Sequence, residues 1–224
     1  MAVPLRIWVT RTQPGANATA ARLTAMGHAP IAQPVLEARA IAGAVIDLAN
    51  IDALAFTSGH AITAFAALSG ERDLPVFTVG EVSALFARQS GFSKVGSADG
   101  DVRALAELIA LAAPGRILNA TALEAAADLA ALLAAQNVQA VTVPVYETVA
   151  VSAAAPPADI NAVLIHSPKA ARLIAASLAR HPHAAQIEAY AISAAAAAPL
   201  RAAGLRAIKI AARPDEAALL ALLP

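Results

Sequence analysis

The chain contains an internal repeat that aligns without gaps. Residues 6–37, RIWVTRTQPGANATAARLTAMGHAPIAQPVLE, align with residues 116–147, RILNATALEAAADLAALLAAQNVQAVTVPVYE, and both segments end in Pro-Val-x-Glu. Two further pairs follow in the same order, residues 52–68 with 161–177 and residues 76–95 with 188–208. A repeated segment implies a repeated structural unit. We therefore expect two similar α/β lobes with a cleft between them.

Short apolar runs alternate with Ala- and Leu-rich segments of helical period along the chain. This alternation is typical of parallel sheets with helices on both faces, in flavodoxin-like or Rossmann-like lobes. The predicted strands are 6–10, 29–34, 53–56, 76–79, 94–96, 116–118, 140–144, 162–165, 189–192 and 206–210. The predicted helices are 15–26, 58–67, 81–90, 102–112, 124–136, 168–180, 194–203 and 215–222.

Two matched segments, residues 35–41 and 145–151, each follow a proline and are rich in extended-chain residues. We interpret both as extended crossovers between the lobes rather than core strands. The first lobe is then discontinuous and comprises residues 1–37 and 149–224, and the second comprises residues 40–145. Two adjacent crossovers can pair as a short ladder and act as a hinge.

The composition excludes several classes of function. Hydrophobic residues make up 58% of the chain, but Ala dominates them and no run reaches the roughly 18 apolar residues that a membrane span requires. Lys and Arg together number 16, as do Asp and Glu, so no basic field favours nucleic acid. Cysteine is absent, and no glycine-rich nucleotide motif occurs. The opening segment MAVPLRIWVT leads directly into a predicted strand, and we expect a cytoplasmic protein.

Five segments carry a resemblance to a known family: VTRTQPGANATAARLTAMGHAPIAQPVLE, FTSGHAI, VFTVGEVSALFARQSGF, PVYETV and HSPKAA. In this order they resemble the uroporphyrinogen-III synthase family. The resemblance implies a two-lobed, monomeric lyase of haem biosynthesis that needs no cofactor and no metal. Its substrate would be hydroxymethylbilane, a linear tetrapyrrole polycarboxylate. The enzyme would close it to uroporphyrinogen III with inversion of ring D and loss of water.

Binding such a substrate requires groups that hold carboxylates. Turns after predicted strands place backbone N–H groups at helix N-termini, where anions are favoured. The predicted substrate-binding residues are Thr10, Arg11, Thr57, Ser58, Gly59, His60, Ala61, Gly80, Ser83, His166, Ser167, Pro168 and Lys169.

Several of these residues have a simpler interpretation. Ser58 and Ser167 occupy equivalent places in the repeat, where serine is also a common helix N-cap. Arg11 could pair with a propionate or lie in solvent at a helix start. His60 and His166 could each donate a hydrogen bond or shuttle a proton across the proposed cleft.

Tyr146 matches the crossover tyrosine of the family, which implies a catalytic residue that assists departure of the substrate hydroxyl. A tyrosine packed at an interface is the alternative.

Two segments depart from the family pattern. The turn expected at residues 119–121 reads Asn-Ala-Thr, and the turn at residues 193–196 reads Ser-Ala-Ala-Ala. The second lacks an expected hydroxyl at Ala196.

Two other hypotheses stay open. Paired α/β lobes with two crossovers also describe binding modules for small anions, and the chain could be a cytoplasmic protein of that kind. It could also be a homologue that has lost activity, because the segment at residues 193–196 is poor in polar groups.

Overall fold

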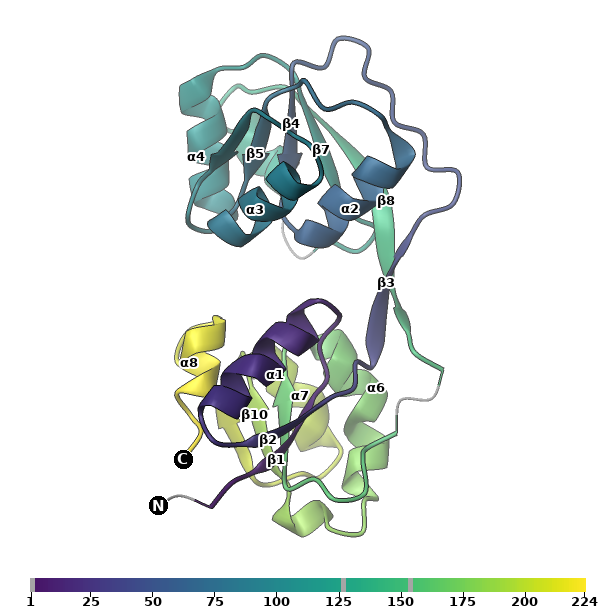
Figure 1. Ribbon diagram of the computed structural model, residues 1–224, viewed down its shortest axis with the longest axis vertical. Coiled ribbons are helices and arrows are strands. Elements are labelled where there is room, and N and C mark those ends of the chain that lie inside the picture. The colour runs from purple at the N-terminus through teal and green to yellow at the C-terminus, as the bar shows by residue number, and fades with distance from the viewer. Residues whose placement is uncertain (1–2, 126–127, 153–154) are drawn as a thin grey trace. The chain divides into compact units, whose positions relative to one another are not determined.

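The computed structural model describes residues 3–125, 128–152 and 155–224. Contacts divide the chain into two compact units (Figure 1). Unit 1 consists of Met1–Glu37 and Val149–Pro224, and unit 2 of Ala38–Thr148. The chain leaves unit 1, builds all of unit 2 and then returns, so unit 1 is discontinuous in sequence.

Unit 1 contains a five-stranded sheet in the order β11-β10-β9-β1-β2, and every neighbouring pair is parallel. Counted along the chain within the unit, this order is 2-1-3-4-5 read from β2, which is the flavodoxin-like order. Its elements are β1 (Arg6–Val9), α1 (Gly15–Ala25), β2 (Ala29–Ala32), β9 (Ala162–Ile165), α6 (Pro168–Ala179), the 3-10 helix η1 (Ala184–Gln186), β10 (Glu188–Ala191), α7 (Ala194–Ala202), β11 (Ile208–Ile210) and α8 (Glu216–Leu220).

Unit 2 is built on a six-stranded sheet in the order β3-β8-β7-β4-β5-β6. Its elements are β4 (Ala53–Phe56), α2 (Gly59–Leu68), β5 (Val76–Thr78), α3 (Glu81–Gln89), β6 (Val95–Ser97), α4 (Val102–Ala112), β7 (Ile117–Ala122) and α5 (Leu129–Ala134), with β3 (Leu36–Ala40) and β8 (Ala140–Ala150) crossing the boundary between the units. The repeat explains this order. The segment β7-α5-β8 is equivalent to β1-α1-β2, but it comes last in unit 2 and first in unit 1. The predicted fold class is confirmed.

Successive residues of each strand point to opposite faces of its sheet, so one strand serves two hydrophobic cores. In β1, Trp8 joins a core with α6 and α7, whereas Ile7 and Val9 join a core with α1 and α8. In β4, the large Leu54 and Phe56 pack with α2 and α3 on one face. The strands read as continuous apolar runs because both faces are covered.

Residues 35–41 and 145–151, predicted as extended crossovers rather than core strands, do cross between the units, and they also belong to the six-stranded sheet as β3 and the second half of β8. β3 and β8 are neighbours in the six-stranded sheet, and β8 is one strand that also pairs with β7. The Ile41 N–H donates to the Val145 carbonyl, and the Val151 N–H donates to the Val35 carbonyl, both at 3.0 Å. Since the two numberings run in opposite directions, β3 and β8 form an antiparallel ladder.

Residues 119–121, expected in a turn, lie inside β7 instead. Asn119 and Thr121 are buried, and the side-chain oxygen of Asn119 has no hydrogen-bond partner among the residues that the structure describes. The helix predicted over residues 124–136 is also shorter. α5 begins at Leu129 behind its N-cap Asp128, and residues 126–127 lie outside the described part of the chain. The strand prediction ended too early because Asn119 and Thr121 are polar, and polar residues interrupt the apolar run that indicates a buried strand.

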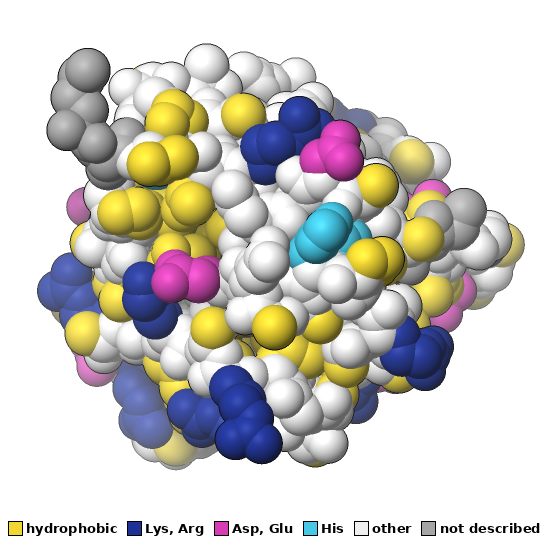
Figure 2. Space-filling model, turned by 90° about the horizontal axis from the view of Figure 1, so that it is seen from below, with side chains coloured by type: hydrophobic (Ala, Val, Ile, Leu, Met, Phe, Trp, Pro, Cys, Tyr) yellow, Lys and Arg dark blue, Asp and Glu magenta, His cyan; other side chains and the backbone are white. Residues whose placement is uncertain are grey.

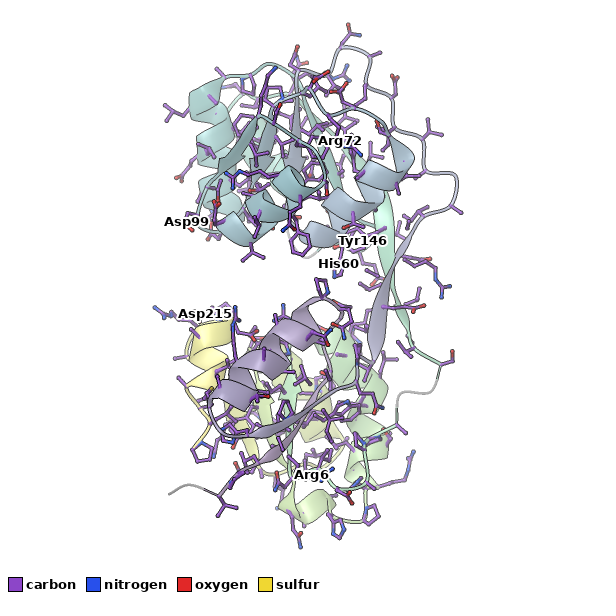
Figure 3. The ribbon with its side chains drawn as sticks, viewed as in Figure 1. Arg6, His60, Arg72, Asp99, Tyr146 and Asp215 are labelled. Atoms are coloured by element: carbon purple, nitrogen blue, oxygen red, sulfur yellow. The ribbon has the colours of Figure 1, made fainter. Side chains whose placement is uncertain are left out.

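The guanidinium of Arg72 joins the C-terminal ends of two helices in unit 2 (Figure 3). It donates to backbone carbonyls at 2.6–3.0 Å and lies 4.9 Å from the centre of the Phe92 ring. The accepting carbonyls belong to Ala66, Ser69, Glu71 and Ser90. Helix ends leave such carbonyls without partners inside the helix, so one arginine satisfies groups of both α2 and α3.

Replacing Arg72 by Lys is expected to lower the free energy of unfolding by about 2 kcal/mol, because a compact ammonium cannot reproduce the planar fork of donors. Urea unfolding followed by far-ultraviolet circular dichroism measures the change. The matched control is Arg103→Lys on the exposed side of α4, for which a change within about 0.5 kcal/mol is expected. Equal losses in both variants would contradict the bridging function of Arg72.

Candidate functional site

In each unit the strand order reverses beside one pair of neighbouring strands. In unit 1, the chain runs from β1 outward to β2 at one edge of the sheet, and from β9 outward to β10 toward the other edge. The direction of strand order therefore reverses between β1 and β9. In unit 2, β4 connects to β5 while β7 connects to β8, so the reversal falls between β4 and β7. Ligands of open α/β sheets bind outside the carboxyl ends of strands at these switch points.

The predicted site residues follow strands or lie in β8, and each unit holds a separate group of them. Unit 2 carries Thr57, Ser58, Gly59, His60, Ala61, Gly80, Ser83 and Tyr146. Unit 1 carries Thr10, Arg11, His166, Ser167, Pro168 and Lys169.

Three of the predicted residues in unit 2 meet at the end of β4. The Tyr146 hydroxyl lies 3.0 Å from the Ser58 hydroxyl, and the ring centres of Tyr146 and His60 are 5.6 Å apart. Figure 3 shows His60 and Tyr146 side by side at this edge of the unit. Tyr146 retains 9% of its surface exposed, so its ring belongs to the core while its hydroxyl lies at the turn.

A β-bulge places Tyr146 in this position. The register of β7 and β8 shifts so that Thr121 pairs with Pro144 and Ala122 with Tyr146, which leaves Val145 as an extra residue. Regular alternation would send Val145 and Tyr146 to opposite faces. With the bulge, both pack in the core that contains α2, and Tyr146 therefore reaches Ser58.

Ser58 links the tyrosine to the N-terminus of α2. Its hydroxyl oxygen accepts the Ala61 N–H at 3.2 Å, so Ser58 is the N-cap of the helix. When the Ser58 O–H donates to the Tyr146 oxygen, the phenol O–H is directed elsewhere and can donate to a ligand. The positive end of the helix dipole polarises this chain of hydrogen bonds. The Ser58 side chain therefore caps α2 and contacts Tyr146 at the same time.

The first residue of α2, Gly59, packs closely against α3. A Cβ atom on Gly59 would lie 3.2 Å from the Phe86 ring of α3, which is tighter than ordinary contact. Gly80 is the N-cap of α3, and Ser83 is buried in the first turn of that helix. Ser83 therefore lies behind the surface of the turn, while Gly80 lies at the carboxyl end of β5.

In unit 1, the side chains of Thr10 and Ser167 bond to the backbone. The buried Thr10 hydroxyl donates to the Leu164 carbonyl at 2.7 Å and ties β1 to β9. The Ser167 hydroxyl accepts the Ala170 N–H at 3.1 Å as the N-cap of α6, which begins at Pro168, with Lys169 next. The same cap recurs at Ser193, whose hydroxyl accepts the Ala196 N–H at 3.2 Å.

The sequence did not predict Glu216, which organises this edge of unit 1. Glu216 is the first residue of α8, next to the labelled Asp215 in Figure 3. One carboxylate oxygen accepts from Arg11 at 2.5 Å and lies 3.2 Å from His166 Nε2. The other accepts from the Thr19 hydroxyl at 2.5 Å, with Arg22 at 3.5 Å. Glu216 lies 205 positions from Arg11 in the chain, and no motif marks it.

The protonation states in this cluster follow from burial and hydrogen bonding. Burial alone would raise the pKa of Glu216, but hydrogen bonds from His166 and Thr19 and the charge of Arg11 lower it to about 2. Burial lowers the pKa of His166, opposed by its hydrogen bond to Glu216. His166 is therefore neutral, with its proton on Nε2 donated to Glu216, and Nδ1 is enclosed without a partner among the described residues.

Other features limit the chemistry of the chain. The described residues hold no group of three or more His, Cys, Asp or Glu side chains arranged for a metal ion. Within the same residues, no helix is long and apolar enough to cross a membrane. On the face seen in Figure 2, basic side chains are spread among acidic and hydrophobic ones.

A hollow of about 620 Å³ lies beside Asp52, Arg116 and Asn137. Asp52 and Arg116 directly precede β4 and β7, so this hollow lies at the amino ends of the strands, away from Ser58 and Tyr146.

Strand order and geometry together define a protein of two flavodoxin-like units, each with a switch point at the carboxyl ends of its strands. A family model described as uroporphyrinogen-III synthase HemD matches residues 17–221. The chain belongs to the uroporphyrinogen-III synthase family. Its function is that of the family, the formation of uroporphyrinogen III from hydroxymethylbilane in tetrapyrrole biosynthesis, and its substrate is a small-molecule tetrapyrrole.

One solved structure is similar to the chain in fold, and a second aligns with it over most of its length. A crystal structure of uroporphyrinogen-III synthetase from Helicobacter pylori has 18% sequence identity and a TM-score of 0.65, covering 97% of each chain. A mutant uroporphyrinogen III synthase from the extremely thermophilic bacterium Thermus thermophilus has 14% identity and a TM-score of 0.49, also covering 97% of each chain. A comparison with curated protein sequences finds no match.

The low pKa of Glu216 makes the stability of unit 1 depend on pH. A carboxyl whose pKa falls from the usual 4.5 to about 2 on folding stabilises the fold above pH 4.5, and this stabilisation is lost as the pH falls toward 2. The loss amounts to about 3 kcal/mol. Fluorescence of Trp8, the one tryptophan, reports unfolding of unit 1.

Glu216→Gln is expected to remove this part of the pH dependence, so the curves for the variant and the parent converge at low pH. Asp159→Asn is the control, because the Asp159 side chain is 73% exposed and its removal should leave the slope unchanged. Parallel curves for Glu216→Gln and the parent would show that Glu216 titrates normally.

Proposed function

We propose that this chain is a cyclising lyase in which Tyr146 is the catalytic residue. The observation that supports this assignment is the contact between Tyr146 and Ser58 at the switch point of unit 2. The Ala61 N–H donates to the Ser58 oxygen, and the Ser58 and Tyr146 hydroxyls share a hydrogen bond in which Ser58 is able to act as the donor. A phenol supported in this way can give its own proton to a leaving hydroxyl.

The first step is the loss of water from the terminal hydroxymethyl group of hydroxymethylbilane. The C–O bond breaks, and the departing oxygen takes a proton from Tyr146. The pyrrole nitrogen of the same ring releases a proton, which can restore the phenol, and an azafulvene is formed. The net change is the loss of one water molecule, and the charges balance.

The following steps invert ring D. The substituted α-carbon of ring D bonds to the azafulvene methylene and gives a spirocyclic pyrrolenine. The older bond from that carbon then breaks, which leaves ring D attached in the reversed direction and a new azafulvene on its former neighbour. The other α-carbon of ring D closes the macrocycle and loses its proton. These steps require mainly that the chain is held in position.

The remaining proposed residues hold the substrate carboxylates. In unit 2 these are the turns Thr57–Ala61 and Gly80–Ser83, with His60 beside the tyrosine ring. In unit 1 they are Arg11 and the turn Ser167–Lys169, whereas the buried Thr10, also predicted to bind substrate, donates its hydroxyl to the Leu164 carbonyl. Backbone N–H groups at the starts of α2 and α6 and the Arg11 guanidinium are suitable donors to carboxylates. The His166 proton is donated to Glu216, so we assign His166 to the support of this edge.

The test is to supply freshly generated hydroxymethylbilane to the purified protein and to separate the type I and type III isomers. Spontaneous closure gives type I, so the type III isomer is the expected product. Type I alone, with tight binding of the linear tetrapyrrole, would instead indicate an anion-binding module. Type I alone without binding would indicate an inactive homologue. The monomeric state and the cytoplasmic location stay predictions from the sequence.

Tyr146→Phe is expected to lower kcat for the type III isomer about tenfold, which corresponds to about 1.4 kcal/mol, because the ring still packs but the proton donor is lost. Tyr190→Phe is the matched control. Tyr190 is the second of the two tyrosines and donates to Glu188, at the amino end of β10. Unchanged kcat in Tyr146→Phe would remove the catalytic assignment.

A further inference from the structure

The guanidinium of Arg11 is held from two sides. On one side it lies against Gly15, the first residue of α1, where a Cβ atom would come within 2.6 Å of Arg11 Nε and 2.9 Å of Cζ. On the other side Nη1 donates to Glu216 at 2.5 Å and lies 3.4 Å from the Thr19 hydroxyl. Only glycine leaves room for the guanidinium in this place.

The carboxylate that holds Arg11 is itself fixed. The Glu216 side chain is 18% exposed, and Thr19 and His166 hold its two oxygens. Arg11 nevertheless retains 35% of its side-chain surface exposed. Its described contacts engage Nη1, and an arginine has five N–H donors in a rigid fork. The guanidinium is therefore anchored through Nη1 and still accessible to a ligand.

The charges of this cluster do not cancel. Arg11 and Arg22 are positive, Glu216 is negative and His166 is neutral, so the cluster carries one net positive charge. The charge lies at the carboxyl end of β1, beside the switch point of unit 1. The matching ligand is a carboxylate, which an arginine binds through paired hydrogen bonds.

We propose that Gly15 and Glu216 are positioning residues that hold the Arg11 guanidinium for a carboxylate of the substrate. The proposal rests on the proposed function and adds two residues to it. A fixed donor loses little conformational entropy on binding, so loss of either support weakens binding of the substrate. The chemical step does not involve this carboxylate, and kcat should change little.

Glu216 has two opposing effects on an anionic substrate. It fixes the guanidinium, which favours binding, but its own charge repels the substrate. The substitution Glu216→Asp distinguishes the two effects. It keeps the negative charge, but the shorter side chain no longer reaches the Arg11 guanidinium. Gly15→Ala displaces the guanidinium from the other side without any change of charge. Alanine is a good helix former, so α1 is expected to tolerate the substitution.

Each variant is expected to raise KM for hydroxymethylbilane about tenfold, equivalent to about 1.4 kcal/mol of binding, with kcat within about twofold of the parent. In an Arg11→Leu background, KM is already raised and neither substitution should raise it further. Glu188→Asp is the control, since Glu188 also holds a tyrosine and a lysine but lies at the amino end of β10. Its KM should not change.

An unchanged or lowered KM in a folded Gly15→Ala variant overturns the proposal. A further rise in KM when either substitution is added to Arg11→Leu overturns it as well. If Glu216→Asp fails to fold, Gly15→Ala alone decides the matter. If the parent protein forms no type III isomer, the proposed function fails. If the parent forms it and KM is insensitive to all three substitutions, Arg11 does not bind a substrate carboxylate and the positioning proposal fails, while the lyase activity stands.

Discussion

The reversal of strand order within each parallel sheet is the constraint on which the site depends. Beside the reversal, the helices that follow two neighbouring strands depart to opposite faces, and their N-terminal ends leave a gap at the edge of the sheet. The turns after β1 and β9 in unit 1 and after β4 in unit 2 lie at such edges. These turns supply N–H groups because the first turn of a helix has donors without partners. The capping serines Ser58 and Ser167 follow from the same requirement.

One local irregularity places a phenol at this edge in unit 2. Without the bulge at Val145, the strict alternation of β8 would place Tyr146 on the face of α4 and α5, away from Ser58. The bulge costs the ladder one residue of pairing, and in return it brings a phenol to the N-terminus of α2. The longer strand also joins both units through its ladder with β3, so the same element carries the connection and the tyrosine.

The sequence predicted the fold because the repeat and the period of the apolar residues reflect packing that both units share. Strand and helix bounds such as those of β4 and α4 follow directly from these patterns. The errors have physical causes. β7 contains Asn119 and Thr121, which are polar although buried, and a bulge has no signature in apolar periodicity. Glu216 was missed because its partners come from α1 and the β9–α6 turn, and only the tertiary fold brings distant charges together.

The side-chain clusters of the two units differ in their charge. The cluster in unit 2 consists of a hydroxyl, a phenol and a backbone N–H, which are neutral and suited to moving a proton. The cluster in unit 1 contains a buried carboxylate whose low pKa keeps it charged, and its excess positive charge is suited to an anion. A chain with equal numbers of acidic and basic residues can therefore bind a polycarboxylate, because binding depends on where fixed donors lie and not on the net charge.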